Sequence, residues 1–142
     1  METVKNSIKK HEGFRNKVYK DTLGKRTIGY GHLCVEDWWE DDKEYTQAEL
    51  ERIFDKDFDK AKEGASKLYE GCEINDTAKG VIIEMVFQLG TTGVSKFKNM
   101  WKALKETPPN YSVAKIEMLD SRWAKQTPNR AKELSNIIGG IN

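Results

Sequence analysis

Apolar residues recur every three or four positions over most of the chain, which is the spacing of one helix face. The longest such run follows Thr46-Gln47-Ala48-Glu49, a capping box in which hydroxyl and carboxylate each accept a bond from the other residue's amide. The pattern predicts a long helix from Thr46 to about Tyr69. Its apolar positions are Leu50, Ile53, Phe54, Phe58, Ala61 and Leu68.

A second helix is apolar on nearly every side from Val81 to Phe87 and has Asn75 as its N-cap. A helix without a polar face belongs in the centre of a hydrophobic core. We expect this helix to end at Gly90, because glycine readily adopts the left-handed conformation that closes helices.

Shorter helices are predicted on both sides of these two. The first contains Val4, Ile8 and His11 and stops at Gly13. Another opens at Ser95 and is terminated by Pro108-Pro109. The remaining elements are a helix from Ser112 to Leu119, a turn of helix around Trp123, and a last helix from Thr127 to Ile138 with Thr127 as N-cap, Pro128 at its first position and Gly139 after its end.

One segment near the N-terminus reads as strands. The runs from Lys17 to Asp21 and from Arg26 to Tyr30 flank a turn at Thr22-Leu23-Gly24-Lys25, which predicts a small hairpin. The acidic segment from Cys34 to Tyr45 is predicted to be a loop. The fold class is therefore α+β, mostly helical, with a small N-terminal antiparallel sheet.

Composition is consistent with one globular domain of 142 residues, with 37% hydrophobic and 33% charged residues. No apolar run approaches the roughly 20 residues needed to cross a bilayer. Met1 to Lys10 lacks the apolar centre of a secretory signal. Two cysteines, Cys34 and Cys72, are too few for a disulfide scaffold, so we expect free thiols and leave a single bridge open.

Charge is unevenly distributed along the chain. Residues 1–35 contain eight Lys and Arg against three Asp and Glu, residues 36–59 three against eleven, and residues 96–133 nine against four. A polyanion would be attracted to the two basic segments if folding brought them together. Solvated faces of opposite sign explain the same counts equally well.

Two charges oppose the dipoles of their predicted helices. Glu12 lies in the last turn of the first helix, where a carboxylate is disfavoured by about 0.3–1 kcal/mol, which favours the neutral acid. Arg130 lies in the first turn of the last helix, also the unfavourable end for its charge. Glycoside hydrolysis needs a carboxylic acid that stays protonated near neutral pH. One hypothesis is that these two charges compensate each other.

Asp21 and Thr27 are candidates for the opposite side of such a site. Each also has an ordinary structural explanation, Asp21 as a turn residue and Thr27 as a β-branched strand residue. If the hairpin register places Thr27 beside Asp21, the pair is able to hold one water opposite Glu12. Inverting glycosidases keep their two carboxyl groups roughly 6.5–9.5 Å apart to accommodate that water.

Four ordered blocks of sequence resemble the T-even bacteriophage lysozyme family, glycoside hydrolase family 24. They keep near-equal spacing over about the first 135 residues, which makes the resemblance specific. The blocks are Glu12-Gly13-Phe14-Arg15 with Tyr19-Lys20-Asp21-Thr22, Thr27-Ile28-Gly29-Tyr30-Gly31-His32-Leu33, Met85-Val86-Phe87-Gln88-Leu89-Gly90 with Thr92-Gly93-Val94, and Ser121-Arg122-Trp123 with Gln126-Thr127-Pro128-Asn129-Arg130-Ala131-Lys132.

The resemblance implies a single lysozyme domain over residues 1–142 with two lobes. The small sheet lobe would cover about residues 14–45, the connecting helix about 46–69, and the helical lobe 1–12 plus 70–142. It also implies hydrolysis, with inversion, of the β-1,4 bond between N-acetylmuramic acid and N-acetylglucosamine in peptidoglycan, which lyses bacterial cells.

Family roles carry over to matching positions of this chain. Glu12 matches the general acid, Asp21 the residue that activates the attacking water, and Thr27 the residue that helps to hold it. Arg130 matches an arginine that pairs with the acid, and His32 a histidine in a structural ion pair, here with Asp57. The implied substrate-binding residues are Leu33, Phe87, Gln88, Arg122 and Gln126.

The chain departs from the family pattern in two places. Between His32 and the long helix it is shorter, and its acidic loop carries Trp38 and Trp39, which either pack under the loop or stack on sugars. Met100 and Glu117 replace small polar residues of the family's cleft, so saccharide subsites are expected to differ.

The expected partner is bacterial peptidoglycan, with no nucleic acid, no cofactor, no metal and no stable membrane insertion, and the protein is expected to be a monomer. Without a visible signal peptide, it would be made in the cytoplasm and would reach the cell wall through a separate holin or a secretion system. Roles in phage lysis, as a toxin or in acquired defence against bacteria stay open.

Three alternatives were compared with hydrolysis. A lytic transglycosylase cleaves the same bond without water and needs one acid, so Asp21 and Thr27 favour hydrolysis. A zinc amidase would draw on His11, His32, Cys34 and Cys72, whose spacing matches no compact ligand motif. A catalytically silent peptidoglycan-binding module of the same fold is the third alternative.

Overall fold

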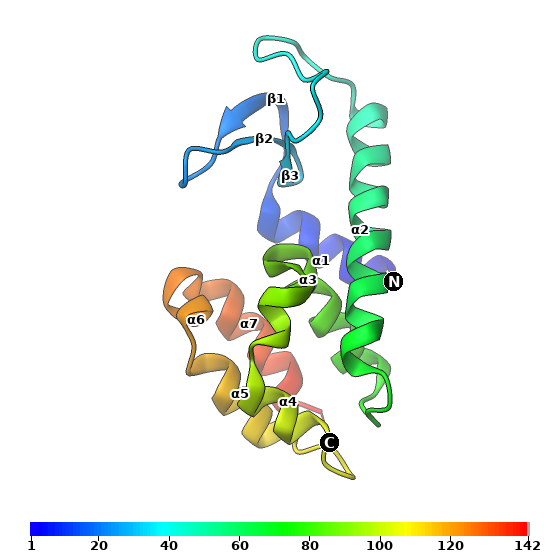
Figure 1. Ribbon diagram of the computed structural model, residues 1–142, viewed down its shortest axis with the longest axis vertical. Coiled ribbons are helices and arrows are strands. Elements are labelled where there is room, and N and C mark those ends of the chain that lie inside the picture. The colour runs from blue at the N-terminus through cyan, green and yellow to red at the C-terminus, as the bar shows by residue number, and fades with distance from the viewer. Residues whose placement is uncertain (142) are drawn as a thin grey trace. The chain divides into compact units, whose positions relative to one another are not determined.

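The computed structural model describes residues 1–141, and its contacts divide the chain into two compact units. The sheet unit is Glu2–Lys60, and the helical unit begins at Ala61 and includes Met1. The fold is α+β and mostly helical, as predicted. Its longest helix, α2 (Gln47–Tyr69), begins in the sheet unit and continues into the helical unit (Figure 1).

The sheet unit contains a three-stranded antiparallel sheet in the order β1-β2-β3. Strand β1 (Arg15–Lys20) pairs with β2 (Arg26–Gly29), and Tyr19 lies opposite Thr27. The predicted hairpin is confirmed, although β1 begins two residues earlier than expected. Strand β3 (His32–Leu33) was not predicted, because two residues are too short to show an alternating pattern.

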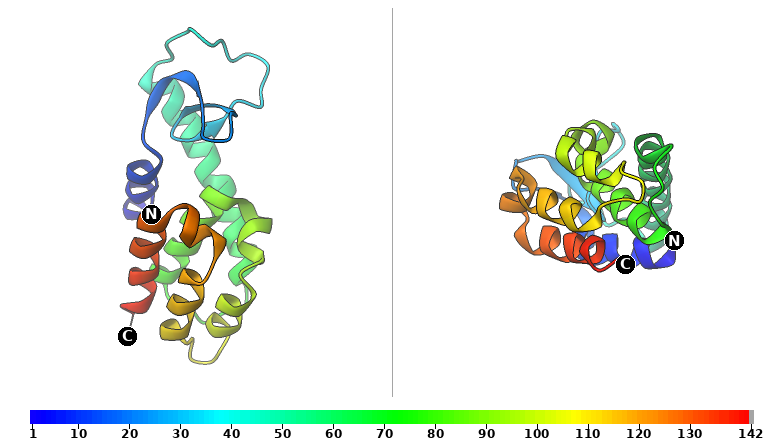
Figure 2. Two further views of the ribbon diagram at one scale, coloured as in Figure 1. Left: turned by 90° about the vertical axis from the view of Figure 1, so that its left-hand side faces the viewer. Right: turned by 90° about the horizontal axis from the view of Figure 1, so that it is seen from below.

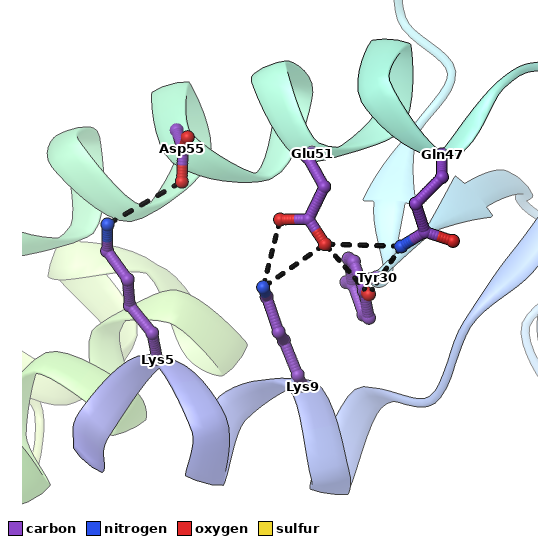
Figure 3. A network of polar contacts seen from close by, with 6 residues as sticks. All are labelled: Lys5, Lys9, Tyr30, Gln47, Glu51 and Asp55. Carbon is purple, nitrogen blue, oxygen red and sulfur yellow. Dashed lines mark hydrogen bonds and ion pairs between the residues drawn. The ribbon is translucent and has the colours of Figure 1, made fainter. Parts of the chain in front are cut away.

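Helix α1 (Glu2–Glu12) is held to the first half of α2 by a network of polar contacts (Figure 3). The Lys9 ammonium lies 3.2 and 2.9 Å from the two carboxylate oxygens of Glu51. Tyr30 donates its hydroxyl hydrogen to Glu51 (3.1 Å), and the Gln47 amide donates to that hydroxyl (3.1 Å). The network joins α1, the β2–β3 turn and α2, which is why α1 belongs to the sheet unit. The lobes implied by the family resemblance, which group residues 1–12 with the helical part, stay a prediction.

The acidic loop that follows β3 (Figure 2, left) packs on a small core of the sheet unit. Trp39 and Tyr45 are each 6% exposed and pack with Ile28 of the sheet and Leu50 of α2. Arg26 anchors the loop by donating to the Trp39 carbonyl (3.0 Å) and by an ion pair with Asp41 (2.8 Å). The packing explanation for Trp39 is therefore correct.

The capping box at the start of α2 is confirmed, because Glu49 N donates to Thr46 Oγ1 (3.1 Å) and Thr46 N donates to Glu49 Oε1 (3.3 Å). Helix α3 (Asp76–Ser95) has the expected Asn75 cap, whose side chain accepts from Ala78 N. The centre of α3 is buried on all sides and forms the core of the helical unit. Its core residues are Ala78, Val81, Ile82, Ile83, Met85, Val86 and Val94.

Helices α4 (Lys98–Leu104), α5 (Tyr111–Leu119), α6 (Arg122–Gln126) and α7 (Pro128–Gly139) complete the helical unit. Figure 2 shows α5 and α7 side by side, and they are in direct contact. The order and number of these helices agree with the sequence pattern, but several ends do not.

Gly90 (φ 80°, ψ 162°) has a non-helical conformation and ends the apolar helix as predicted, and a second helical segment of α3 follows it to Ser95. The predicted boundaries at Ser95 and Gly139 are wrong. Ser95 ends α3 and does not open α4. Helix α7 includes Gly139 and is capped by Gly140. The start of α7 is confirmed, with Thr127 at the N-cap and Pro128 as the first helical residue. The Thr127 side chain makes no capping bond, because its hydroxyl donates to the Trp123 carbonyl (3.1 Å).

Both cysteines carry free thiols and are half-buried. Cys34 lies in the sheet unit and Cys72 in the helical unit. Among residues 1–141, none of the helices combines the length and the apolar character that a bilayer-spanning segment needs.

Candidate active site

Glu12 is the last residue of α1, where Gly13 adopts φ 73° and closes the helix by donating to the Lys9 carbonyl (2.9 Å). Its half-buried carboxylate lies against the backbone of Gly31, which follows β2. A Cβ on residue 31 would be 2.5 Å from Glu12 Oε1. Glycine at position 31 thus leaves the space that the Glu12 carboxylate occupies.

Asp21 lies in the turn between β1 and β2. Its Oδ1 accepts bonds from the amides of Leu23 (2.9 Å) and Lys25 (2.8 Å), and its own amide donates to the Lys25 carbonyl. These hydrogen bonds agree with the structural explanation of Asp21 as an ordinary turn residue. They also restrict the orientation of the carboxylate through Oδ1.

Thr27 is 3% exposed, and its hydroxyl donates to the Lys25 carbonyl at 3.0 Å. The register places Thr27 opposite Tyr19 rather than opposite Asp21. Since residues 19 and 21 point to the same face, Thr27 and Asp21 are diagonal neighbours on that face. Diagonal neighbours lie roughly 7–8 Å apart, a spacing that a water molecule is able to bridge.

Tyr19 is a residue of this site that the sequence reasoning missed. Burial raises the pKa of its phenol, the charge of Arg15 acts to lower it, and the charges of Glu12 and Asp21 raise it further. Both carboxylates are therefore close enough to act on the same phenol. Like any phenol, Tyr19 is protonated at neutral pH and is able to donate a hydrogen bond. Its place in the Tyr19-Lys20-Asp21-Thr22 motif was the available signal.

His32, in β3, lies between two carboxylates. Its Nδ1 is 2.7 Å from Asp57 and its Nε2 is 2.9 Å from Glu36, which also accepts from the Trp39 indole at 2.6 Å. Burial by itself lowers the pKa of His32, but the hydrogen bonds and charges of Asp57 and Glu36 outweigh it, so the pKa is raised. Asp57 was expected from the sequence and Glu36 was not. The cluster attaches the acidic loop to β3 and α2.

Of the residues expected to bind substrate, only Leu33 lies in the sheet unit. It is 43% exposed and pairs with Thr27 across the β2–β3 ladder, so both side chains share one face of the sheet. The acidic loop adds Trp38, which is 59% exposed beside the buried Trp39.

Gln88 and Phe87 lie half-buried on α3 in the helical unit. The Gln88 carbonyl accepts from the Trp123 indole (2.8 Å), and its amide nitrogen approaches Thr127 Oγ1 at 3.4 Å. These contacts fix the orientation of the Gln88 amide.

Arg122 and Gln126, both exposed on α6, line a cavity of about 520 Å³ in the helical unit. Met100 and Glu117, the two departures from the family pattern, line the same cavity. The structure therefore brings Arg122 and Gln126 together with the residues expected to alter the saccharide subsites.

Arg130 is 8% exposed in the first turn of α7, and its Nε is 3.0 Å from Glu84 Oε2. Glu84 lies in the centre of α3 and is 1% exposed. The sequence analysis missed this buried ion pair, because Glu84 stands within an otherwise apolar run and gave no sign of its partner. Pairing of Arg130 with the catalytic acid stays a prediction.

No group of three or more potential His, Cys, Asp or Glu ligands gathers into a metal site within residues 1–141. The side chains of Glu12, Asp21, Tyr19 and Thr27 supply carboxyl, phenol and hydroxyl groups. A carboxylic acid near a carboxylate and a hydroxyl is the equipment of acid–base hydrolysis at a glycosidic bond.

Comparison with known proteins identifies the class. The model of the phage lysozyme family matches residues 9–136, which is most of the chain. The chain belongs to this family and is a glycoside hydrolase of the lysozyme type.

Three relatives are similar over most of the chain. Probable T4-type lysozymes 2 and 1 of Dictyostelium discoideum are 29% and 30% identical to it, and each alignment covers 96% of this chain and 93% of the relative. The pre-baseplate central spike protein Gp5 of Enterobacteria phage T4 is 30% identical over 92% of this chain but only 26% of its own length.

Proposed function

We propose that this protein is a muramidase that hydrolyses the β-1,4 bond between N-acetylmuramic acid and N-acetylglucosamine of bacterial peptidoglycan, with inversion, and thereby lyses bacterial cells. Membership of the phage lysozyme family supports peptidoglycan as the substrate. The observation that carries the mechanism is the position of the Glu12 carboxylate against Gly31, just after the strand that carries Thr27 and pairs with the strand leading to Asp21.

In this mechanism Glu12 donates its proton to the leaving glycosidic oxygen. Asp21 accepts a proton from the attacking water, and Thr27 holds that water from the neighbouring diagonal position of the hairpin. The water enters from the face opposite the leaving group, so the configuration at the anomeric carbon inverts. Leu33 on the same sheet face would contact the sugar, while Phe87, Gln88, Arg122 and Gln126 would bind further parts of the glycan.

The decisive experiment compares turnover of purified peptidoglycan by wild type and by Glu12→Gln and Asp21→Asn. Glutamine retains the size of Glu12 but has no transferable acid proton, so hydrolysis should fall by at least about 100-fold while the far-UV circular dichroism spectrum is unchanged. Substantial activity of the folded Glu12→Gln variant would reject the assignment of the acid.

Product analysis separates hydrolysis from the transglycosylase alternative. Mass spectrometry should find reducing ends that have gained water, whereas 1,6-anhydro ends would show lytic transglycosylation. Proton NMR during the first minutes of reaction should show the α-anomer forming first, as inversion requires.

A further inference from the structure

A second cavity of the helical unit, about 380 Å³ in volume, is lined by basic side chains. The three lysines Lys98, Lys102 and Lys105 lie on or just after α4, and no acidic residue lines the cavity. Its other lining residues are Leu68, Ser95 and Trp101. We call it the lysine groove.

The charges of this groove are not compensated within the structure. None of its three lysines is within ion-pair distance of a carboxylate in the part of the chain that the structure describes, residues 1–141. Lysines on nearby helices behave differently, since Lys67 pairs with Glu63 on α2 and Lys79 with Asp76 on α3. Three uncompensated positive charges around one cavity create a local potential that attracts anions.

The geometry of α4 suits an extended anion. Lys98, Lys102 and Lys105 recur at intervals of four and three residues, so they lie on one face of the helix. The seven-residue span corresponds to roughly 10 Å along the helix axis. A chain of phosphate groups therefore fits this row of ammonium groups better than a single small anion.

The aromatic residue of the groove argues against a nucleic acid. Binding of single strands relies on exposed aromatic rings on which bases stack. Trp101 is only 6% exposed, and its indole N–H donates to the Val94 carbonyl at 3.0 Å, so it offers no such platform. The groove offers positive charge but no surface for base stacking. These properties suit a phosphodiester polymer with small polyol units, which carries phosphate groups and no bases.

We propose that the lysine groove binds the phosphate groups of an anionic polyol-phosphate polymer of the bacterial cell surface. This inference rests on the proposed function, because an enzyme that acts on peptidoglycan encounters such polymers beside its substrate. Binding there would retain the enzyme at the wall, and the retention would weaken as salt screens the charges.

The test uses the intact protein and a fluorescently labelled poly(glycerol phosphate) as the probe, with fluorescence anisotropy as the readout. The test variant is K102Q/K105Q, since Lys98 also lines the larger cavity and is left unchanged. The matched control is K60Q/K62Q, two exposed lysines of α2 outside the groove. Both double variants lower the net charge equally.

We expect K102Q/K105Q to bind the probe about tenfold more weakly than wild type at low salt, and K60Q/K62Q less than about twofold more weakly. The slope of log Kd against the logarithm of the salt concentration should decrease by about one to two in K102Q/K105Q. It should not change in K60Q/K62Q. Equal weakening in both variants would show a net-charge effect and overturn the proposal. Tighter binding of a single-stranded oligonucleotide of equal charge would overturn it in favour of a nucleic-acid site.

The same variants separate this inference from the proposed function. K102Q/K105Q should hydrolyse peptidoglycan that has been freed of its phosphate polymer at the wild-type rate. On walls that retain the polymer it should be slower than wild type. Glu12→Gln should bind the probe normally, because its acid lies in the sheet unit. Hydrolysis by Glu12→Gln would reject the assignment of the acid without bearing on the lysine groove. Unchanged probe binding by K102Q/K105Q would reject the lysine groove without bearing on the assignment of the acid.

Discussion

The carboxylate of Glu12 lies against the α-carbon of Gly31, where even a methyl group would come within 2.5 Å of Oε1. The glutamate side chain is flexible, so Gly31→Ala should displace the carboxylate rather than prevent folding. A displacement of about 1 Å of a catalytic group costs up to about 100-fold in rate. We therefore expect kcat of Gly31→Ala to fall at least about tenfold in a peptidoglycan-turnover assay.

The control for this variant is Gly71→Ala. Gly31 (φ 77°) and Gly71 (φ 81°) share the left-handed conformation, but a Cβ on residue 71 meets no atom within 4 Å. Each substitution should lower the free energy of unfolding by about 1 kcal/mol, because an L-residue is strained there. Equal activity of the two variants would show that the contact with Glu12 has no role in turnover.

Tyr19→Phe tests whether the phenol whose pKa responds to both Glu12 and Asp21 takes part in the reaction. A phenol is protonated at neutral pH, so its hydroxyl is available to donate a hydrogen bond to the water or the sugar. Loss of one such bond should lower kcat about tenfold and change KM less than about twofold. Tyr69→Phe removes another phenol of raised pKa, from the helical unit, and should leave both constants unchanged. A KM effect alone would indicate ground-state binding instead.

The fold was predictable wherever local signals and packing agree. The capping box at Thr46 and the apolar face behind it predicted α2 correctly at both ends, because cap and period point to the same boundaries. The prediction at Ser95 was wrong, because serine is a common N-cap and the short helical segment between Gly90 and Ser95 has no apolar repeat of its own. Gly90 does end the apolar helix, but local sequence does not show that a further helical segment follows it directly.

The residues of the candidate site were also predictable only in part. Glu12 was a candidate because its charge opposes the helix dipole, and Asp21 and Thr27 because of their places in the hairpin. Their roles came from the motif resemblance, and Asp21 and Thr27 also have ordinary structural explanations that spacing alone does not exclude. Tyr19, Glu36 and Glu84 gained their significance only from partners that folding brings close, such as Arg130, which is 46 residues from Glu84. The periodicity of apolar residues does not predict such pairings, because it describes each helix or strand separately.

His32→Asn should destabilise the protein in a pH-dependent manner. The pKa of His32 is raised above 6.5 in the folded state, so its contribution is fully present below about pH 6.5 and is lost as the pH rises through the folded value. We expect the variant to lose about 2 kcal/mol of unfolding free energy at pH 6 and progressively less at alkaline pH, measured by urea denaturation. Turnover per folded molecule should change little.

Glu36→Gln is the companion of this variant. Burial by itself raises the pKa of Glu36, but its hydrogen bonds with His32 and Trp39 outweigh this, so the pKa is lowered and the carboxylate stays charged over the same pH range. The variant should therefore show the same sign of pH dependence with a smaller loss. A loss of stability that is constant from pH 6 to pH 9 would contradict the pairing of charged groups around His32.

Glu84→Gln should be more destabilising than any change at the surface. Glu84 and Arg130 are 1% and 8% exposed, and removing the charge of one member leaves the other with less compensation in a region of low dielectric. Loss of one partner of a buried pair costs about 3–5 kcal/mol, whereas Glu63→Gln, which breaks an exposed pair with Lys67, should cost less than about 0.5 kcal/mol.

Replacing both members of the buried pair distinguishes lost compensation from a general packing defect. In the double variant Glu84→Leu/Arg130→Met no buried charge remains, so it should be more stable than Glu84→Leu alone by about 2 kcal/mol or more. Urea denaturation of wild type, both single variants and the double variant gives the coupling energy directly. If the losses of unfolding free energy in the two single variants add up to the loss in the double variant, Glu84 and Arg130 do not stabilise each other. In that case another interaction must hold Arg130 in the first turn of α7.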